Sequence, residues 1–364
     1  MESLVRQDHF FLSRCCEIGQ LAGPESSPNP KVGAVLVYNG KIIGEGYHKI
    51  AGKEHAEVKC LASVSDHNRA LIPLSTLYVS LEPCCFHGRT PACTDLILRS
   101  DIQTVVIGQL DQTPRVSGQG VEILRNAGKE VRIYPDHEGC RKLAGERNLF
   151  VTQHRPYIIL KWAQSTDGFM APNSNEPYWI SSALTRRLTH KWRSQTGAIL
   201  VGAATVLADD PSLTTRFYPG KDPVRVVFDP RNRCTGHERV FQVESDSPTL
   251  WFSSQAPNLE RNASTTEHFV LEHKEENWLP NILDELYRRG INQLTVEGGA
   301  YTLGLFLKMG LVDEIRRITN TQLAIGDGLP APHIAALANK PGQDEWRPAE
   351  VQKIDTDQLE TFRL

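Results

Sequence analysis

The 364-residue sequence contains no long apolar run and no excess of positive charge. No segment approaches the roughly 18 apolar residues that a membrane-spanning helix requires, and the N-terminal residues lack the apolar core of a secretory signal. Lysine and arginine number 40 against 43 aspartate and glutamate residues, which argues against a nucleic-acid binder that relies on phosphate contacts. The composition, 40% hydrophobic and 23% charged, excludes a disordered chain. We therefore expect a soluble, cytoplasmic protein without a membrane or nucleic-acid partner.

Cysteine is nearly absent from the second part of the chain, and tryptophan is absent from the first. The eight cysteines are too few for a disulfide scaffold, and all but Cys234 lie at or before Cys140. All six tryptophans follow residue 160. A polar segment that ends at Pro156 separates the two regions, and the length suits two domains of ordinary size. We expect a first domain over residues 1–150 and a second over residues 151–364.

Both regions alternate apolar, strand-like runs with helical segments. Asn39 and Gly40 separate two short apolar runs, which is a strong signal for a β-hairpin. The alternation predicts an α/β fold in which parallel strands follow this hairpin. Expected strands cover residues 32–38, 41–46, 76–81, 104–108, 130–134, 157–161, 198–201, 225–228, 249–252, 293–296 and 313–317. Expected helices cover residues 10–21, 55–64, 90–99, 120–127, 182–193, 281–289 and 301–308.

A metal-binding pattern stands out between residues 55 and 93. His55 and Glu57 form a His-x-Glu motif, and Cys84 follows a Leu-Glu-Pro sequence, with Cys93 farther on. One imidazole and two thiolates leave the fourth position of a tetrahedral zinc ion open for water, which is the arrangement of catalytic zinc sites. Glu57 is then a candidate proton carrier that is not itself a ligand. This pattern is typical of zinc-dependent nucleobase deaminases.

The spacing leaves the third ligand open. The deaminase pattern places two residues between its cysteines, whereas eight separate Cys84 from Cys93. Cys85 and His87 therefore compete with Cys93 on the residues alone. The alternative without a metal is that these cysteines are small, buried apolar side chains.

The motifs of the first region together resemble the deaminase half of the bifunctional deaminase/reductase of riboflavin biosynthesis. They are PNPKVG at 28–33, GEGYH at 44–48, HAEV at 55–58 and LEPCCFHGRTPAC at 81–93. The resemblance implies a cytidine-deaminase-like three-layer α/β/α domain with His55, Cys84 and Cys93 as zinc ligands. It also implies a phosphoribosylamino-pyrimidine substrate that contacts Asn29, His48 and Arg89. Cys85 and the segment 111–118 depart from the family pattern, which puts substrate detail in doubt more than the metal.

The second region resembles the reductase half of the same family, which implies a dihydrofolate-reductase-like α/β domain that uses NADPH. The sequence contains no G-x-G-x-x-G motif, so a Rossmann domain is not supported. Glycines 298 and 299 lie where a predicted strand meets a predicted helix, a place where backbone N–H groups can bind phosphate. The matching segments include residues 156–161, 165–168, 179–181, 202–216 and 296–299.

The resemblance also implies roles for residues of the reductase half. Two arginines suit a phosphorylated sugar, because the guanidinium binds phosphate oxygens in a bidentate fork. Pro177 and Pro230 depart from the family, which often has a serine at each position, and the run 318–326 departs as well. The implied cofactor-binding residues are Ala163, Trp179, Thr205, Asp209, Gly298 and Gly299, and the implied substrate-binding residues are Arg193, Leu213, Arg216 and Glu297.

The resulting expectation is a cytoplasmic homo-oligomer that first deaminates a pyrimidine ribotide and then reduces its ribosyl group with NADPH. Two alternatives stay open at this point. The His-x-Glu motif after an apolar hairpin also resembles tRNA adenosine deaminases, although the net charge of −3 and the second domain argue against them. The substitutions at Pro177 and Pro230 leave room for a protein whose second domain binds or scaffolds without catalysing.

Overall fold

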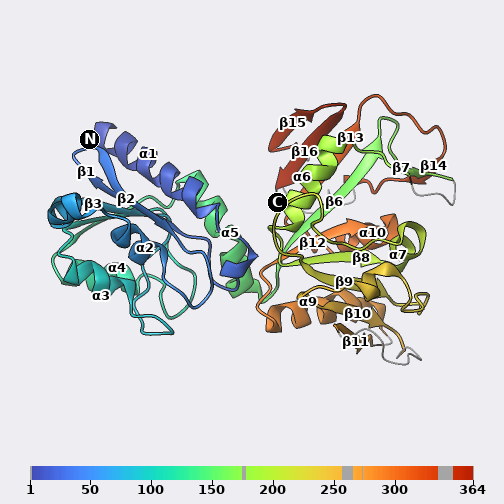
Figure 1. Ribbon diagram of the computed structural model, residues 1–364, viewed down its shortest axis with the longest axis horizontal. Coiled ribbons are helices and arrows are strands. Elements are labelled where there is room, and N and C mark those ends of the chain that lie inside the picture. Colours follow the sequence, from blue (N-terminus) through green and yellow to red (C-terminus); the bar gives the residue numbers. More distant parts are fainter. Residues whose placement is uncertain (1, 174–177, 256–264, 273, 335–346, 364) are drawn as a thin grey trace. The chain divides into compact units, whose positions relative to one another are not determined.

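The computed structural model describes residues 2–173, 178–255, 265–272, 274–334 and 347–363 (Figure 1). The chain divides into two compact units, residues 1–155 and 156–364. The division lies after Arg155 because the helix α5 (Glu138–Gln153) belongs wholly to the first unit, where Leu143 and Ala144 are buried. None of the described helices combines the length and apolarity that a membrane span needs.

The first unit is built on a five-stranded sheet with the order β2-β1-β3-β4-β5. Strands β1 (Gly33–Tyr38) and β2 (Lys41–Tyr47) form the expected hairpin, and Asn39 and Gly40 have the positive φ angles, 46° and 73°, of its two-residue turn. Strands β3 (Thr76–Val79), β4 (Thr104–Ile107) and β5 (Glu130–Ile133) run parallel to one another. The prediction of a hairpin followed by parallel strands is confirmed.

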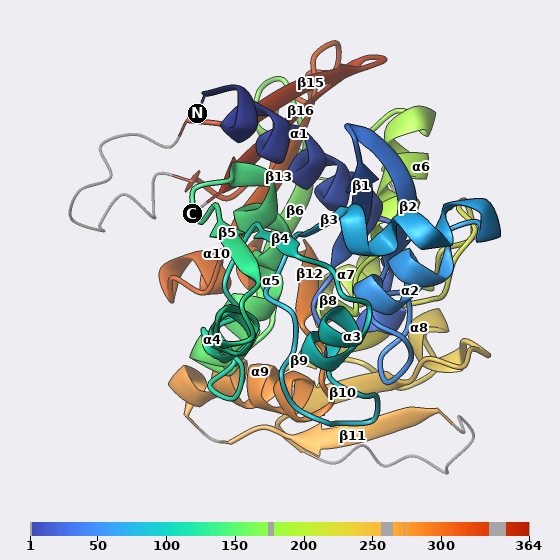
Figure 2. The same cartoon turned by 90° about the vertical axis from the view of Figure 1, so that its left-hand side faces the viewer.

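Helices cover both faces of this sheet, so the three-layer α/β/α prediction is confirmed (Figures 1 and 2). Helices α2 (Ala56–Ala62), α3 (Cys93–Arg99) and α4 (Gln119–Asn126) bury Cys60, Ile97 and Leu124 against one face. Helix α1 (Glu2–Gly19) packs Phe11 and Leu12 on the other face, and α5 contributes Cys140 there. Helix α1 begins eight residues before the expected start, and α5 and the 3₁₀ helix Asp66–Leu74 were not predicted.

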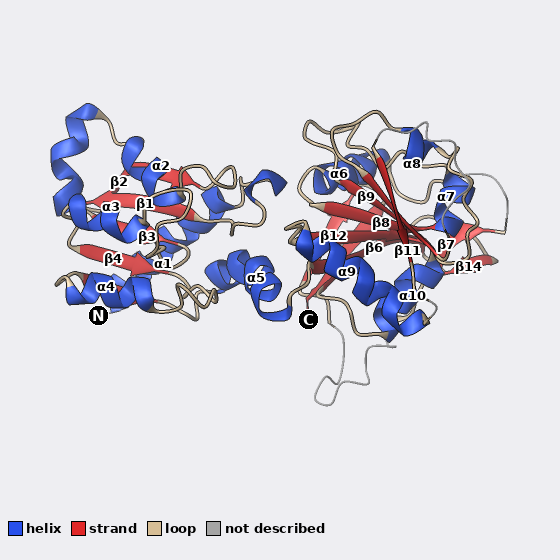
Figure 3. Cartoon of the chain, turned by 90° about the horizontal axis from the view of Figure 1, so that it is seen from below, coloured by secondary structure: helices blue, strands red, loops and turns tan. Residues whose placement is uncertain are grey.

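The second unit contains a nine-stranded sheet with the order β11-β10-β9-β8-β12-β6-β13-β16-β15 (Figure 3). The pairs from β11 to β13 are parallel, and β16 and β15 add an antiparallel edge. The predicted strands all exist, as β6 (Tyr157–Ser165), β8 (Ala198–Gly202), β9 (Val224–Asp229), β10 (Thr249–Ser253), β12 (Gln293–Gly298) and β13 (Glu314–Asn320). The unpredicted strands are β7 (Phe169–Pro172), β11 (Thr266–Val270), β14 (Gly328–Pro330), β15 (Glu350–Ile354) and β16 (Asp357–Arg363).

Two apolar cores lie on the two faces of this sheet. One contains Leu283 of α9 (Trp278–Arg288) and Phe306 of α10 (Ala300–Lys308), together with Trp162. The other contains Val206 of α7 (Ala203–Asp209) and Trp251 and also draws on the short helix α8 (Arg239–Gln242). Helix α6 (Ala183–Arg193) begins with a Ser182 side chain that accepts a hydrogen bond from the Thr185 N–H. Helices α7 and α8 escaped prediction because each has only one or two turns.

Candidate active sites

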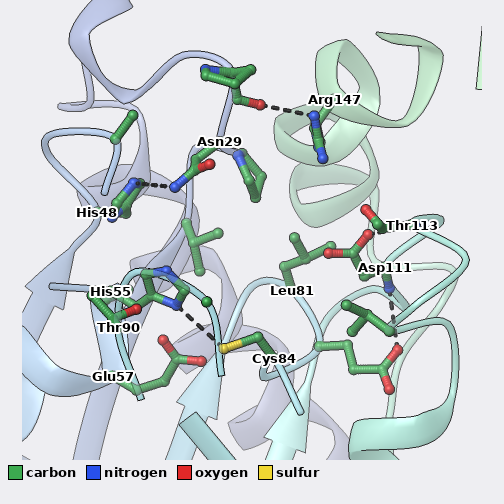
Figure 4. Close-up of a pocket in the computed structure, with 18 of the residues that line it drawn as sticks. Asn29, His48, His55, Glu57, Leu81, Cys84, Thr90, Asp111, Thr113 and Arg147 are labelled. Atoms are coloured by element: carbon green, nitrogen blue, oxygen red, sulfur yellow. Dashed lines mark hydrogen bonds between the residues drawn. The ribbon is translucent and has the colours of Figure 1, made fainter. Parts of the chain in front are cut away.

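The structure of the first unit brings His55, Cys84 and Cys93 together at the ends of three elements, and Figure 4 shows His55 beside Cys84. His55 precedes α2 as its N-cap, Cys93 is the first residue of α3, and Cys84 lies in the loop that follows β3. The His55 Nδ1 lies 3.3 Å from the Cys93 Sγ and 3.5 Å from the Cys84 Sγ. A nitrogen and a sulfur ligand of one tetrahedral zinc ion lie about 3.5 Å apart. The donor set and its spacing therefore fit zinc.

The two competing ligands from the sequence lie elsewhere. The Cys85 Sγ is directed to the backbone oxygen of Arg115 at 3.4 Å. The His87 Nε2 lies 3.1 Å from the Asp95 carboxylate on an exposed surface. Among the described residues, Cys93 is thus the third side chain whose donor atom joins those of His55 and Cys84.

Electrostatics around the two thiols favour a single thiolate before any metal binds. A hydrogen bond with the Cys93 thiol lowers the pKa of Cys84, and a further hydrogen bond with His55 acts in the same direction. The Cys93 N–H also donates to the Cys84 Sγ at 3.4 Å. The hydrogen bond between the two thiols, which lowers the pKa of Cys84, raises the pKa of Cys93. Cys84 is therefore the first of the two to become a ligand anion.

Glu57 lies in the first turn of α2, beside the cluster. Its side chain is buried, and burial raises its pKa above the ordinary carboxyl value. Figure 4 shows its carboxylate next to His55 and Cys84, on the floor of a cavity of about 360 Å³. A carboxyl group held here reaches the reaction site without occupying a ligand position.

Asn29, His48 and Arg89 line the same cavity. The His48 Nδ1 lies 3.0 Å from the backbone oxygen of Glu54, which can only accept, so the Nδ1 carries the hydrogen. The His48 Nε2 then accepts from the Asn29 amide nitrogen at 3.1 Å. These two hydrogen bonds orient the Asn29 side chain so that its amide oxygen is free to accept a hydrogen bond from a substrate donor. Burial lowers the pKa of His48 and keeps the ring neutral.

No role was assigned from the sequence to two further residues of this cavity. The buried Glu82 carboxylate accepts hydrogen bonds from the N–H groups of Gly118 at 2.9 Å, Val121 at 3.2 Å and Asp111 at 3.3 Å. It thereby holds the segment 111–118, which forms one wall. Arg147 of α5 lines the cavity as well and donates to the Pro28 oxygen at 2.9 Å. Arg147 was missed because α5 itself was not predicted.

In the second unit, the residues implied for cofactor and substrate line two cavities that share Thr205, Asp209 and Glu297. Gly298 and Gly299 belong to the larger cavity, of about 630 Å³. The smaller one, of about 370 Å³, is lined by Ala163, Trp179, Arg193, Leu213 and Arg216. The structure thus brings together all ten residues implied by the family resemblance in this unit.

A buried charge network lies on the wall of the smaller cavity. The Arg193 Nη2 and Nε donate to the two Glu297 carboxylate oxygens at 2.8 and 3.1 Å, and the Lys161 Nζ lies 4.0 Å from the same carboxylate. Burial alone would raise the pKa of Glu297, but the charges of Arg193 and Lys161 lower it to about 2. Burial lowers the pKa of Lys161. The cluster therefore keeps a net positive charge as long as Lys161 is protonated.

The Gly298–Gly299 turn connects β12 to the N-terminus of α10, as predicted. Gly299 has a φ of +64°, a conformation that residues with a Cβ rarely adopt. A Cβ on Gly298 would lie 3.1 Å from the Thr205 hydroxyl, which is tighter than ordinary contact. Glycine at both positions lets the backbone N–H groups at this helix start approach a ligand.

His190 of α6 is a further cavity residue that sequence reasoning missed. Burial and the nearby charges of Arg193 and Arg216 lower the pKa of His190 to about 4, so its ring is neutral near pH 7. Periodicity alone could not separate this inward-facing polar residue from the apolar positions of the helix.

The departures from the family pattern fall unevenly on the structure. Pro177 lies outside the described residues. Pro230 lines the larger cavity, where its ring offers no hydrogen-bond donor. The neighbouring Asp229 is buried and fixes the turn by accepting from the N–H groups of Arg233 and Cys234, each at 2.9 Å. The turn is therefore ordered although the hydroxyl is missing.

Comparison with known proteins covers both units. Residues 156–358 match the family described as the RibD C-terminal domain, and residues 5–109 match the cytidine and deoxycytidylate deaminase zinc-binding region. The riboflavin biosynthesis protein RibD of Aquifex aeolicus (strain VF5) is 44% identical over 331 residues, which cover 89% of this chain and 91% of that protein. RibD of Escherichia coli (strain K12) is 36% identical over 327 residues, which cover 85% and 86%.

The chain belongs to the RibD family. Two solved structures share its architecture throughout. The deaminase/5-amino-6-(5-phosphoribosylamino)uracil reductase of Thermotoga maritima superposes with a TM-score of 0.86 at 35% identity, and Acinetobacter baumannii RibD (form 1) with 0.83 at 30%. Each match covers 98% of this chain and 99% of the other.

The RibD assignment confirms the expected activity class and α/β fold. The protein is a bifunctional deaminase and reductase of riboflavin biosynthesis, with a zinc-binding deaminase domain and an NADPH-dependent reductase domain. The alternatives of a tRNA deaminase and of a binding protein without a second activity are therefore set aside.

Proposed function

We propose that residues 1–150 deaminate 2,5-diamino-6-(5-phosphoribosylamino)pyrimidin-4-one by hydrolysis. Residues 151–364 then reduce the ribosyl group of the resulting 5-amino-6-(5-phosphoribosylamino)uracil to a ribityl chain. The observation that carries this proposal is the pairing, in one chain, of a His-Cys-Cys cluster beside Glu57 with a second, cationic cavity around Arg193. The first arrangement suits hydrolysis of an amino group, and the second suits a phosphorylated sugar.

In the deaminase unit, we assign His55, Cys84 and Cys93 as zinc ligands. Zinc, when bound there, supplies a water molecule whose pKa is low enough for it to act as a nucleophile near neutral pH. Glu57 would carry two protons in turn, the first from the attacking water to the ring nitrogen and the second from the added hydroxyl group to the departing amino group. The amino group would then leave as ammonia, the ring carbon would become a carbonyl, and Glu57 would return to its starting state.

The same cavity contains groups that can position the ribotide. The Asn29 amide oxygen is set by His48 to accept a hydrogen bond from the pyrimidine. Arg89 and Arg147 supply cationic side chains on the cavity wall for the phosphate. Glu82 acts through the backbone of the segment 111–118 and is a positioning residue.

In the reductase unit, NADPH supplies the hydride that reaches the ribose C1′. Arg193 and Arg216 bind the phosphate group of the substrate. Glu297 holds the Arg193 side chain in place through two hydrogen bonds. Leu213 completes the substrate wall. The residues assigned to the cofactor are Ala163, Trp179, Thr205, Asp209, Gly298 and Gly299.

The test supplies purified, zinc-loaded protein with the diaminopyrimidinone ribotide and NADPH and follows both products. We expect ammonia release matched by NADPH oxidation. Ammonia without oxidation would limit the assignment to the first unit and implicate Pro177 and Pro230 in the loss of the second. If neither ammonia release nor NADPH oxidation is observed, the substrate assignment is overturned.

We further propose that the protein acts in the cytoplasm as a homo-oligomer without a nucleic-acid partner. The net charge of −3 supports the absence of nucleic-acid binding. Native mass spectrometry of the purified chain tests the oligomer, and a monomer under those conditions would contradict it. Retention of tRNA by the protein at low salt would contradict the proposed absence of a nucleic-acid partner.

A further inference from the structure

A second group of metal-binding side chains lies in the first unit, on the opposite face of its sheet from α2 and α3. Cys16 of α1 approaches Cys140 of α5 and His137, the residue that caps α5. All three side chains are buried, and one donor atom from each lies within 4.8 Å of the others. The match to the deaminase zinc-binding region ends at residue 109, so two of the three residues lie outside it.

The spacing of the two sulfurs suits a shared cation. The Cys16 Sγ lies 3.3 Å from the Cys140 Sγ. This distance is far longer than the roughly 2.05 Å of a disulfide bond. Two thiolates on one tetrahedral zinc ion lie about 3.8 Å apart, so a shift of about half an ångström would place both at bonding distance.

His137 is held in the tautomer that a metal ligand needs. Its Nε2 lies 3.2 Å from the backbone oxygen of His9, which can only accept, so the Nε2 carries the hydrogen. The Nδ1 therefore has a lone pair, which receives the Cys140 N–H at 3.2 Å. Metal ligation would replace that long hydrogen bond. A ligand imidazole that donates its other N–H to a backbone carbonyl is the usual second layer of a metal site.

The local sequence also suits such a site. His137 and Cys140 occupy the N-cap and the third position of the 16-residue helix α5, so both side chains lie at the same helix start. Cys16 comes from a helix 124 residues away in sequence. No fourth ligand side chain among the described residues joins these three, so water would complete the coordination.

We propose that Cys16, His137 and Cys140 bind a second zinc ion, whose role is structural because the three residues are buried and do not line the deaminase cavity. The ion clamps α1 to α5 and lies apart from the catalytic cluster. The site is buried, so it fills as the unit folds or during slow local opening.

The test counts zinc per chain in the full-length protein after zinc loading and desalting, by inductively coupled plasma mass spectrometry. We expect two zinc ions in the wild type, one in the Cys16→Ser/Cys140→Ser variant and one in Cys84→Ser. Cys15→Ser is the matched control, because Cys15 is a buried neighbour outside the cluster, and it should retain both ions. One ion in the wild type that is lost with Cys84→Ser would overturn the proposal.

Cobalt substitution gives a second readout that does not depend on stability or activity. In the Cys84→Ser/Cys93→Ser background, we expect thiolate-to-cobalt charge-transfer bands from the second site. His137→Gln should alter or abolish these bands. Absence of the bands in a folded sample would overturn the proposal, and so would a Cys16–Cys140 disulfide in the purified wild type, seen as the loss of two hydrogens in its mass.

Discussion

Arg193 and Glu297 are joined by two hydrogen bonds of 2.8 and 3.1 Å although they lie 104 residues apart in the chain. Both side chains are largely buried, and Arg193 also donates to the Thr214 oxygen at 3.2 Å. The planar fork of the guanidinium fills both carboxylate oxygens at once, which a lysine cannot do. Glu297 thereby fixes the direction in which Arg193 presents its charge to the reductase cavity.

Replacing Arg193 with alanine should destabilise the second unit by about 3 to 5 kcal/mol, because Glu297 would remain buried with its main partner removed. Arg193→Lys should recover only part of the loss. Differential scanning calorimetry of the full chain can measure the transition of the second unit. Arg187→Ala is the matched control, because Arg187 lies on the same helix but is exposed. Equal effects of Arg193→Ala and Arg187→Ala would contradict this account of the pair.

Acid should weaken the second unit through Glu297. Its pKa in the folded protein is about 2, below the ordinary value of 4.5. Its ionised form therefore stabilises the fold above about pH 4.5, and this contribution disappears as the pH falls toward 2. The contribution is up to about 3 kcal/mol. Urea unfolding at a series of pH values should show a shallower decline in Glu297→Gln than in the wild type; identical slopes would refute the prediction.

Glu57→Gln should reduce ammonia release by at least about a hundredfold, because the amide cannot accept and return a proton. Zinc content should stay unchanged, since Glu57 is not among the three ligand side chains. NADPH oxidation should remain normal when the deaminated ribotide is supplied directly. If ammonia release continues at the wild-type rate, Glu57 is not the proton carrier.

Serine substitution should change zinc binding at Cys93 but not at Cys85. Cys93→Ser should lose the catalytic zinc or bind it far more weakly, because the Cys93 Sγ lies 3.3 Å from the His55 Nδ1. Cys85→Ser should retain it, because the Cys85 thiol is directed toward the Arg115 oxygen. Competition with a chromophoric chelator measures both affinities. Loss of this zinc in Cys85→Ser would reassign the third ligand.

Local motifs made the catalytic cluster predictable from the sequence. His55 and Glu57 share one helix start, and Cys84 follows a short buried strand. The eight-residue interval before Cys93 could not be interpreted by spacing alone, and only the family resemblance selected that residue. The Asn39–Gly40 hairpin was also predictable, because its turn depends on two adjacent residues with positive φ.

Features that depend on contacts distant in sequence were not predictable. Glu82 binds backbone N–H groups 29 to 39 residues away, and no residue type marks such partners. Strands β15 and β16 form an antiparallel edge in which β15 is almost entirely exposed, so they lack the apolar runs of the buried strands. Helix α5 was missed because few of its positions are apolar.

The confinement of tryptophan to the second unit makes tryptophan fluorescence a report on the reductase alone. Trp162 and Trp251 are buried in its two separate cores, so their emission follows the packing of both faces of that sheet. Trp179 is 62% exposed on the cavity wall and lies under the Arg186 guanidinium, so a reduced nicotinamide that binds there can quench it by energy transfer. Loss of zinc from the deaminase is silent to this signal unless the two units communicate. An optical change on chelation would then be a direct sign of coupling.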